Sequence, residues 1–352
     1  MPIKSCRWAV CIWMVTGYNM TIINEEFPMK AMVCERFGEP DVIAEREVPD
    51  PVPPGPGEIQ VRIAARGVQY VDVLMLAGKY QFRPEPPFIP GGEAAGHVIA
   101  VGSDVTGFAI GDAVMSRHTL GAMAEIGNAK AVLCDKVPAG LSMAQAGVFR
   151  GAYTTAYHAL AQRGRMQPGE WVLIHGAAGG IGIAAIQVAK AFGAKVIATA
   201  GTDEKRQACL EEGADHAIDY RSGFVDQVKQ LTGGRGVDIV YDPIGDKVAE
   251  ESLRCLAWGG RLLILGFLGG GPTNIKSNYL LIKGIDAIGV RIGGLNEANP
   301  ELAIANMKAL VALAEQGKLR PRISHTFRLD QAAEALQMVI DRKVIGKAVL
   351  LG

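Results

Sequence analysis

The pattern of apolar and polar positions changes character along the chain. From residue 29 to about 150 it consists of short apolar runs, some alternating with polar residues, separated by Gly, Pro and Asp turns. From 171 to 266, apolar runs alternate with longer segments of helical periodicity. After the glycines at 269–271 the pattern becomes mixed again. A strand-rich stretch followed by alternating strands and helices predicts two domains of different architecture.

The first part is predicted to be β-rich with few helices. A proline-rich loop occupies residues 49–57, and an alanine-rich stretch at 141–162 predicts helical segments that lead into the second part. The strands expected before it lie at residues 31–37, 58–65, 98–101, 113–115 and 131–133.

The second part repeats a unit of strand followed by helix. Such repetition predicts a parallel sheet with helices on both faces, a doubly wound fold with at least five strands. The expected strands are residues 171–174, 195–200, 214–220, 236–242 and 260–266. The expected helices are residues 180–192, 202–212, 223–231 and 246–257.

Two further helices and a strand are predicted near the C-terminus. Residues 301–316 form an amphipathic pattern, and a last helix is expected to begin at Asp330 as its N-cap. Residues 347–350 read as a closing strand. The buried positions expected on these helices are Met307, Leu310, Val311, Ala314, Ala332, Leu336, Val339 and Ile340.

A glycine-rich turn connects the first strand of the doubly wound part to its first helix. Glycines let the backbone approach a pyrophosphate closely, and the amides of the following helix N-terminus can bind the anion. Ala177 stands where the usual GxGxxG fingerprint has its first glycine. The alternative is a glycine-rich connection that binds nothing, but three such glycines cost stability. The residues expected to bind a dinucleotide here are Ala178, Gly179, Gly180, Ile181 and Gly182.

Composition narrows the class of partner and compartment. The 352 residues include 36 Lys and Arg and 36 Asp and Glu, so no net charge attracts nucleic acid or an anionic membrane. No apolar run approaches the ~18 residues that span a bilayer. The six cysteines, at positions 6, 11, 34, 134, 209 and 255, form no CxxC pair. We therefore expect reduced thiols, a small-molecule substrate and a cytoplasmic protein.

The first 28 residues do not fit either domain. Lys4 and Arg7 precede an apolar run at 8–15, as in a signal peptide, but the run is short and no small-residue cleavage site follows. Met29 is a second candidate start, because it opens directly into a strand pattern. We expect a disordered extension at residues 1–28, with a targeting segment as the alternative.

Five motifs occur in order along the chain, at residues 67–72, 91–96, 111–114, 177–182 and 346–350. They resemble those of the medium-chain dehydrogenase/reductase superfamily, and within it the zinc-free quinone oxidoreductase, or zeta-crystallin-like, branch. The resemblance implies an α/β protein with a GroES-like β-rich catalytic domain and a doubly wound Rossmann domain that binds the nucleotide. It places the catalytic domain at 29–150 and 289–352, the Rossmann domain at 151–288, and the active site in the cleft between them.

The residues argue against a catalytic zinc. In zinc alcohol dehydrogenases of this superfamily, Cys stands where this chain has Gln69, and His stands where it has Gly92. Neither is a usual zinc ligand, and Glu93 with the nearby His97 does not make a tetrahedral site. A four-cysteine structural zinc lobe is also missing.

The cofactor is expected to be NADPH, although NADH remains open. NAD sites place an acid at the end of the second strand, whereas this strand ends in Gly201 and Thr202, with no acid before Asp203. The resemblance assigns Lys205 and Tyr220 to the 2′-phosphate of NADPH. It also places Thr155 near the nicotinamide, with Ile244, Gly266 and Phe267 around it, although Ile244 and Phe267 serve equally well as packing residues.

The expected reaction is zinc-independent hydride transfer to a quinone or similar conjugated carbonyl, where one or two hydrogen-bond donors can stabilise the developing oxyanion. Tyr80 and Gln69 are the candidate donors, with Asp72 orienting Gln69. A structural aromatic role for Tyr80 and a capping role for Asp72 are equally compatible with the sequence. Leu74 stands where some relatives have a second pocket tyrosine, which makes the pocket more apolar.

Two other functions remain open. One is reduction of the double bond in enones, alkenals or enoyl thioesters, with Arg83 or Arg291 as cations at the cleft for a thioester. The other is an NADPH-binding structural or regulatory protein without turnover. A homodimer or homotetramer is implied by the resemblance, through edge strands of the nucleotide domains. Residues 262–268 are a candidate edge, although an ordinary core strand is the favoured interpretation.

Overall fold

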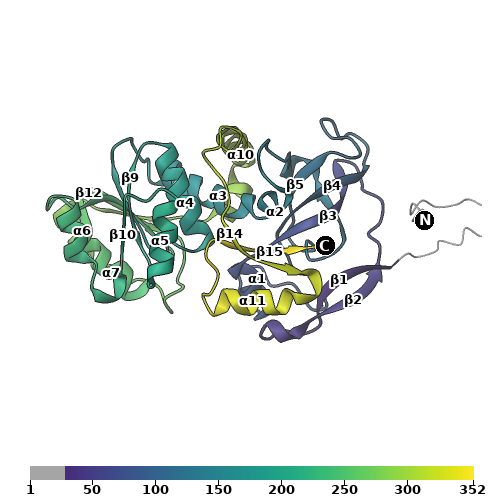
Figure 1. Cartoon of the computed structure of the whole chain (residues 1–352), viewed down its shortest axis with the longest axis horizontal. Coiled ribbons are helices and arrows are strands. Elements are labelled where there is room, and N and C mark those ends of the chain that lie inside the picture. Colours follow the sequence, from purple (N-terminus) through teal and green to yellow (C-terminus); the bar gives the residue numbers. More distant parts are fainter. Residues whose placement is uncertain (1–27) are drawn as a thin grey trace, which may run out of the picture.

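The computed structural model describes residues 28–352, so the expected N-terminal extension lies outside the described residues except for Pro28. Two sheets occupy opposite ends of the long axis of the molecule, and helices α3 (Phe149–Tyr157) and α10 (Pro300–Glu315) lie between them (Figure 1). The largest core cluster contains residues of α3, α4 (Gly180–Ala191) and α10 together with Met115 of the first sheet. The two halves are therefore joined by apolar packing.

The first sheet contains the predicted β-rich part of the chain. Its strand order is β14-β15-β3-β4-β5-β7, and β6 also pairs with β3. The C-terminal strand β15 pairs antiparallel with β3, so the chain returns to its first domain, as expected for a GroES-like fold. A separate antiparallel pair is formed by β1 (Pro28–Cys34) and β2 (Ile43–Pro49). The sheet strands are β3 (Glu58–Val68), β4 (Glu93–Val101), β5 (Ala113–Arg117), β6 (Ile126–Lys130), β7 (Cys134–Lys136), β14 (Ile323–Arg328) and β15 (Lys347–Leu351).

The second sheet confirms the doubly wound fold. It has six strands in the order β10-β9-β8-β11-β12-β13, all in parallel pairs. The order reverses between β8 and β11, where ligands bind in open α/β sheets. The strands are β8 (Trp171–Ile174), β9 (Lys195–Thr199), β10 (His216–Ile218), β11 (Val237–Asp242), β12 (Leu256–Ile264) and β13 (Asp286–Gly289).

The sixth strand decides the position of the segment proposed as an oligomer edge. Because β13 pairs with β12, Leu262 and Leu263 lie inside the sheet with no exposed surface. The core-strand interpretation of this part of 262–268 is therefore confirmed. The edge on this side of the sheet is β13.

Helices cover both sheets, and α3 continues into a π-helical turn at His158–Arg163. The helices that connect successive strands of the second sheet along the chain are α4, α5 (Asp203–Glu211), α6 (Val225–Leu231) and α7 (Asp246–Cys255). The remaining helices are α1 (Tyr70–Leu76), α2 (Met143–Ala146), α8 (Ser277–Lys283), α9 (Ile292–Ala298) and α11 (Ala332–Ile340). No helix of residues 28–352 is long and apolar enough to cross a membrane.

Two local predictions are wrong. Residues Ala131–Leu133 form a 3-10 turn before the short strand β7, and Val132 is 68% exposed, so an apolar run here is a surface turn. Asp330 lies inside a 3-10 turn, where it pairs with Arg328 at 2.9 Å, and the residue before α11 is Gln331. In both places the local sequence suits a strand or a helix N-cap, but the chain forms a 3-10 turn that leads into the next element, β7 or α11.

Two of the buried histidines, His118 and His175, have lowered pKa values and should make the protein sensitive to acid. His118 is bonded to Ser116, and His175 lies between Thr199 and Ser252. Burial lowers the pKa of His118 to about 4 and that of His175 to about 3. A folded pKa below the unfolded value of about 6.5 gives stability that is present above that pH and lost as the pH falls. We expect each histidine to remove about 2 kcal/mol from the free energy of unfolding by about pH 5.

Urea denaturation at about pH 7 and pH 5 measures this loss, and substitution separates it from other titrating groups. His175→Gln should show a smaller pH dependence of the free energy of unfolding than the unmodified protein. The control His97→Gln replaces an exposed histidine and should leave the pH dependence unchanged. An unchanged pH dependence in His175→Gln would contradict the prediction.

Candidate active site

The glycine turn lies at the carboxyl end of β8, at the point where the strand order reverses. Gly176 has φ of 57°, a left-handed conformation that favours glycine. A methyl group built on Gly182 would lie 2.5 Å from the carbonyl oxygens of both Gly176 and Ala177. The turn therefore packs directly against the first turn of α4, and Gly182 is needed for that approach.

The N-terminus of α4 is suited to an anion. Its N-cap is Gly179, no side chain caps it, and the helix is 12 residues long. The first amides of a helix have no partner within the helix, so those of Gly180, Ile181 and Gly182 are available to phosphate oxygens. Ala178 is buried, and its carbonyl oxygen accepts a hydrogen bond of 2.8 Å from Gly346. The predicted dinucleotide-binding residues of this turn thus lie together in a geometry that fits a pyrophosphate.

Further residues predicted to bind the cofactor, beyond the glycine turn, follow β9 and β10. A methyl group on Gly201 would lie 3.3 Å from the Tyr220 hydroxyl, so the tyrosine ring covers this glycine. Thr202 caps α5 by accepting a hydrogen bond of 3.3 Å from the amide of Lys205. The ammonium of Lys205 donates to the carbonyl oxygen of Arg342 at 2.5 Å. The resemblance assigned Lys205 and Tyr220 to one phosphate, and the structure adds Arg342 beside Lys205.

Arg342 could not be found from the sequence. It lies in the turn after α11, with φ of 56°, and its guanidinium donates to the carbonyl oxygen of Leu268 at 3.1 Å. It therefore connects the catalytic-domain end of the chain with the loop after β12. Asp203, the first acid after β9, is at the beginning of α5 and pairs with Arg206. Arg206 also lies 3.3 Å from Asp219.

The loops after β11 and β12 form one apolar wall beside the glycine turn. Gly269 donates to the carbonyl oxygen of Ile244 at 2.7 Å. A methyl group on Gly176 would lie 3.3 Å from Cδ1 of Ile244, so this side chain borders the turn. Phe267, which is 50% exposed, packs against Gly245. Gly266 precedes it, and the predicted nicotinamide wall therefore adjoins the phosphate turn.

A second group of predicted residues surrounds Gly151 in the first turn of α3. A methyl group on Gly151 would lie 3.2 Å from both the Gln69 amide nitrogen and a Glu93 carboxylate oxygen. The Thr155 hydroxyl donates to the carbonyl oxygen of Gly151 at 2.7 Å. Tyr80 is half-buried in the loop after α1. Gln69, Thr155 and Glu93 thus meet where the two domains adjoin.

Asp72 is buried and has the capping role that the sequence left open. Its carboxylate accepts a hydrogen bond of 2.9 Å from the backbone amide of Gln69, at the beginning of α1. Burial raises the pKa of Asp72 to about 7, although this hydrogen bond and the charge of Lys347 oppose the increase. Asp72 fixes the backbone that carries Gln69.

A buried ion pair links the catalytic domain to the glycine turn. The ammonium of Lys347 lies 3.0 Å from the Glu93 carboxylate, and their side chains are only 11% and 3% exposed. The other Glu93 oxygen accepts a hydrogen bond of 2.7 Å from Gly151. A methyl group on Gly180 would lie 2.6 Å from Cδ of Lys347, so the lysine chain crosses the beginning of α4. Lys347 stood in the C-terminal motif, but its partner lies 254 residues away.

The residues considered for zinc are not assembled as a metal site. Glu93 is already bonded to Lys347 and Gly151, and His97 is exposed, with Nδ1 3.4 Å from the carbonyl oxygen of Gly111. Among residues 28–352, no three His, Cys, Asp or Glu side chains form a group that could hold a metal ion. The cysteines of this part of the chain are free and buried: Cys34, Cys134, Cys209 and Cys255.

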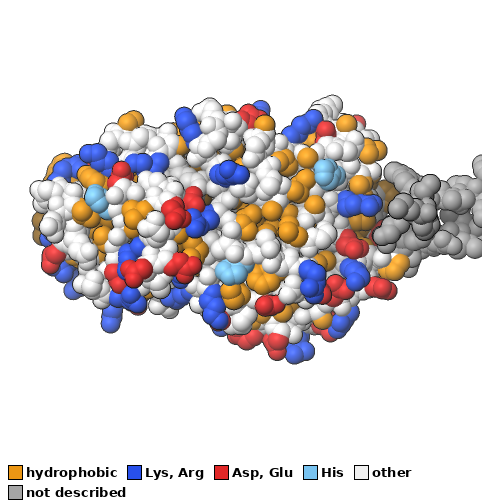
Figure 2. Space-filling model, in the orientation of Figure 1, with side chains coloured by type: hydrophobic (Ala, Val, Ile, Leu, Met, Phe, Trp, Pro, Cys, Tyr) orange, Lys and Arg blue, Asp and Glu red, His pale blue; other side chains and the backbone are white. Residues whose placement is uncertain are grey.

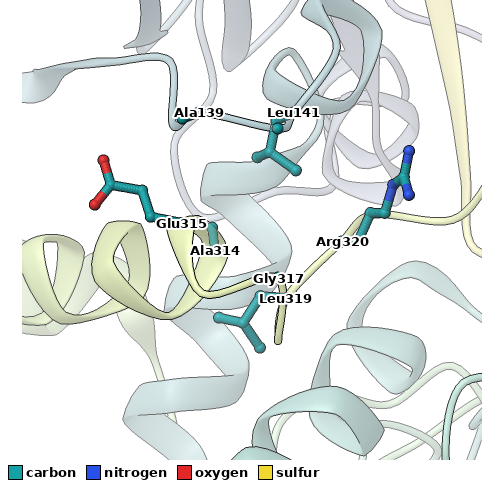
Figure 3. Close-up of a pocket in the computed structure, with 8 residues that line it drawn as sticks. Ala139, Leu141, Ala314, Glu315, Gly317, Leu319 and Arg320 are labelled. Carbon is teal, nitrogen blue, oxygen red and sulfur yellow. The ribbon is translucent and has the colours of Figure 1, made fainter.

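Another hollow of the surface lies away from these residues. It is formed by residues 139–141 and the end of α10, and Glu315 and Arg320 extend away from each other on its two sides (Figure 3). None of the predicted site residues lines it. On the face shown in Figure 2, basic and acidic side chains are interspersed rather than segregated. The candidate site therefore consists of the glycine turn and of the side chains of Gln69, Glu93 and Thr155 around Gly151, which we call the Gly151 group.

Comparisons with known proteins agree with this arrangement. Residues 55–165 match the alcohol dehydrogenase GroES-like domain family, and residues 180–309 match the zinc-binding dehydrogenase family. Quinone oxidoreductase-like protein 2 of Mus musculus is 37% identical over 99% of this chain and 96% of its own length. Quinone oxidoreductase of Homo sapiens is 32% identical over 92% of this chain and 98% of its own.

Solved structures show the same likeness. A probable oxidoreductase from Mycobacterium abscessus superimposes with a TM-score of 0.85 at 35% identity, over 92% of this chain and 99% of that one. Escherichia coli quinone oxidoreductase complexed with NADPH gives a TM-score of 0.84 at 32% identity, over 92% of this chain and 100% of that one.

Proposed function

Because this chain belongs to the medium-chain dehydrogenase/reductase superfamily, among the quinone oxidoreductase-like proteins, we propose that it uses NADPH to reduce a quinone or a similar conjugated carbonyl compound. The observation that carries the proposal is the continuity of the site. The uncapped N-terminus of α4 is joined to the Gly151 group by Lys347, which crosses Gly180 and pairs with Glu93. A bound dinucleotide on that turn would lie beside hydrogen-bonding side chains.

NADPH is favoured over NADH by the charges after β9. The Tyr220 ring covers Gly201, and the Lys205 ammonium reaches the carbonyl oxygen of a second cation, Arg342, whereas Asp203 is already paired with Arg206. A 2′-phosphate accepts charge-assisted hydrogen bonds from such cations, while a ribose hydroxyl needs a free carboxylate. The structure of the Escherichia coli relative complexed with NADPH supports the same choice.

The reduced nicotinamide would supply the hydride, and the protein would position it and stabilise charge. The Thr155 hydroxyl donates to Gly151, so its lone pairs remain free to accept from a carboxamide. The Gln69 amide and the Tyr80 hydroxyl are the proposed donors to the oxygen on which charge develops. Asp72 is a positioning residue, because it holds the backbone of Gln69. Since Gln69 and Gly92 are poor zinc ligands, we propose that turnover needs no zinc.

The proposed function is tested by consumption of NADPH and NADH with benzoquinone, phenanthrenequinone, an alkenal and crotonyl thioester, each with and without a chelator. Chelator-resistant turnover that prefers NADPH is expected. Reduction of the alkenal or thioester alone would replace the quinone class with double-bond reduction. Binding of NADPH without reduction of any acceptor would favour the structural or regulatory protein.

We also propose a homo-oligomer formed through the edge strand β13. Apolar side chains beside it are unusually exposed: Trp258 by 82%, Leu281 by 85% and Ile282 by 71%. A methyl group on Gly284 would lie 3.7 Å from the Trp258 ring, so the end of α8 and this tryptophan are neighbours. An open strand edge with an adjacent apolar patch is suited to pairing with a second copy.

A charge in this patch should separate the copies. Leu281→Asp is expected to convert the protein to a monomer in sedimentation analysis, because an unpaired carboxylate would be buried in the interface. Val132→Asp, at another exposed apolar position, serves as the control and should not change the mass. A monomeric unmodified protein, or an oligomer that persists in Leu281→Asp, would contradict the proposal.

A further inference from the structure

Arg117 at the end of β5 is a cation that the proposed function has not used. It is half-buried, and its side chain makes no hydrogen bond or ion pair with any residue from 28 to 352. Its cross-strand partner in the sheet is Glu93, the acid of the buried ion pair. Removing a guanidinium partly from water without a counter-ion costs free energy, and a bound anion would offset that cost.

The strand pattern places Arg117 on the same side as the candidate site. Side chains two residues apart share a face of a strand, and Met115 packs in the core cluster with Ala152 and Tyr153 of α3. The Arg117 side chain therefore projects from the face of β5 that meets α3. The charge of Glu93 is already balanced by Lys347 at 3.0 Å, and its other oxygen accepts from the backbone amide of Gly151.

The other charged groups near Arg117 also leave it without a partner. Arg150 is a second buried cation, already paired with Asp135. Burial lowers the pKa of Arg117, and the nearby Tyr80 and Glu297 oppose this effect. Glu297 pairs with Arg291 at 3.3 Å, and its side chain is 69% exposed. An arginine stays protonated under these conditions, so a net positive charge remains beside Tyr80.

We propose that Arg117 binds an anionic group of the acceptor, so that the substrate is a conjugated carbonyl compound carrying a carboxylate or a similar anion. This inference rests on the proposed reductase function and narrows its substrate class. The planar guanidinium matches a carboxylate through two parallel hydrogen bonds. The anionic group takes no part in bond making or breaking, and it orients the acceptor so that its carbonyl oxygen reaches Tyr80 and Gln69.

Matched acceptors test the proposal. Benzylideneacetone and its meta- and para-carboxylates differ only in the anion, so the ratio of kcat/KM for the better carboxylate to that for the neutral enone measures its recognition. In Arg117→Gln this ratio should fall about ten- to a hundredfold, as expected for loss of a charged hydrogen bond. Arg117→Lys should retain part of the ratio, because charge remains without the fork.

The control is Arg46→Gln, which makes the same change in net charge on β2. Arg46 pairs with Glu35, and both side chains are about half exposed, at 48% and 52%. This variant should leave the ratio unchanged. The KM for NADPH should be the same in all variants, which separates acceptor recognition from cofactor binding.

Equilibrium binding keeps the inference testable if turnover is absent. Calorimetry with the NADP⁺-loaded protein and the saturated product of the better carboxylate should show weaker binding in Arg117→Gln by the same factor. No reduction of any acceptor, with Arg117-dependent binding of the carboxylate, would reject the reductase function and retain the anion site. A ratio and an affinity that are unchanged in Arg117→Gln would overturn the inference.

Discussion

Gly182→Ala is expected to reduce the affinity for NADPH by about a hundredfold and to lower the melting temperature. The added methyl group would lie 2.5 Å from the carbonyl oxygens of Gly176 and Ala177 and 2.6 Å from Cα of Ala177. These are backbone atoms of the turn itself, so the clash cannot be relieved by a side-chain rotation. The strain should exceed the ~1–3 kcal/mol typical of overpacking, and the turn must move away from the amides that hold the phosphates.

Fluorescence titration with NADPH and thermal unfolding measure the two effects separately. The matched control is Gly55→Ala, because a methyl group at Gly55 would make only an ordinary contact of 3.5 Å with a Glu58 carboxylate oxygen. That variant should keep both the affinity and the melting temperature. Tight NADPH binding by Gly182→Ala would show that the pyrophosphate does not bind at this turn.

Glu93→Gln is expected to destabilise the protein by about 3–5 kcal/mol, because it leaves Lys347 buried without its counter-charge. Activity should fall as well, since the pair joins β4 and the first turn of α3 to the beginning of α4. Urea denaturation gives the loss of stability. Single-turnover oxidation of NADPH at saturating cofactor gives the effect on the reaction itself.

Two further variants test whether the loss of stability in Glu93→Gln comes from the buried, unpaired charge of Lys347. Removing both charges in Glu93→Gln with Lys347→Met should recover much of the stability, because no unpaired ion remains. Asp330→Asn breaks an exposed pair whose side chains are 72% and 45% exposed, and it should change the free energy of unfolding little. A loss in Glu93→Gln as small as that in Asp330→Asn would contradict the prediction.

The regular elements of the nucleotide domain could be predicted because their signals are local. An apolar run at 171–174, the glycines at 179, 180 and 182 and the helix after them each follow from short-range steric and burial requirements. The corresponding strand and helix are β8 and α4. The same local pattern predicted a strand wrongly at residues 131–133. Val132 and its apolar neighbours form an exposed surface turn, and exposure depends on the fold rather than on the local sequence.

The site was only partly accessible from the sequence. The resemblance assigned Lys205, after β9, and Tyr220, after β10, to one phosphate group, and the structure places Tyr220 against Gly201 and bonds Lys205 to Thr202. Their roles toward a cofactor stay predictions. The capping bond of Asp72 was one of two open alternatives, and only the hydrogen bond to Gln69 distinguishes a positioning residue from a catalytic one.

By itself the sequence determined the two architectures, the glycine turn and the class of cofactor that suits it, because these depend on residues close together in the chain. Only the tertiary structure decided which charges are paired. Lys347 pairs with Glu93 across 254 residues, and the Lys205 ammonium is held by the backbone carbonyl oxygen of Arg342 across 137. Arg117 stands beside Glu93 in the sheet and yet has no partner among the described residues. The energy of a charge depends on its burial and on neighbours brought by the fold, which no local pattern specifies.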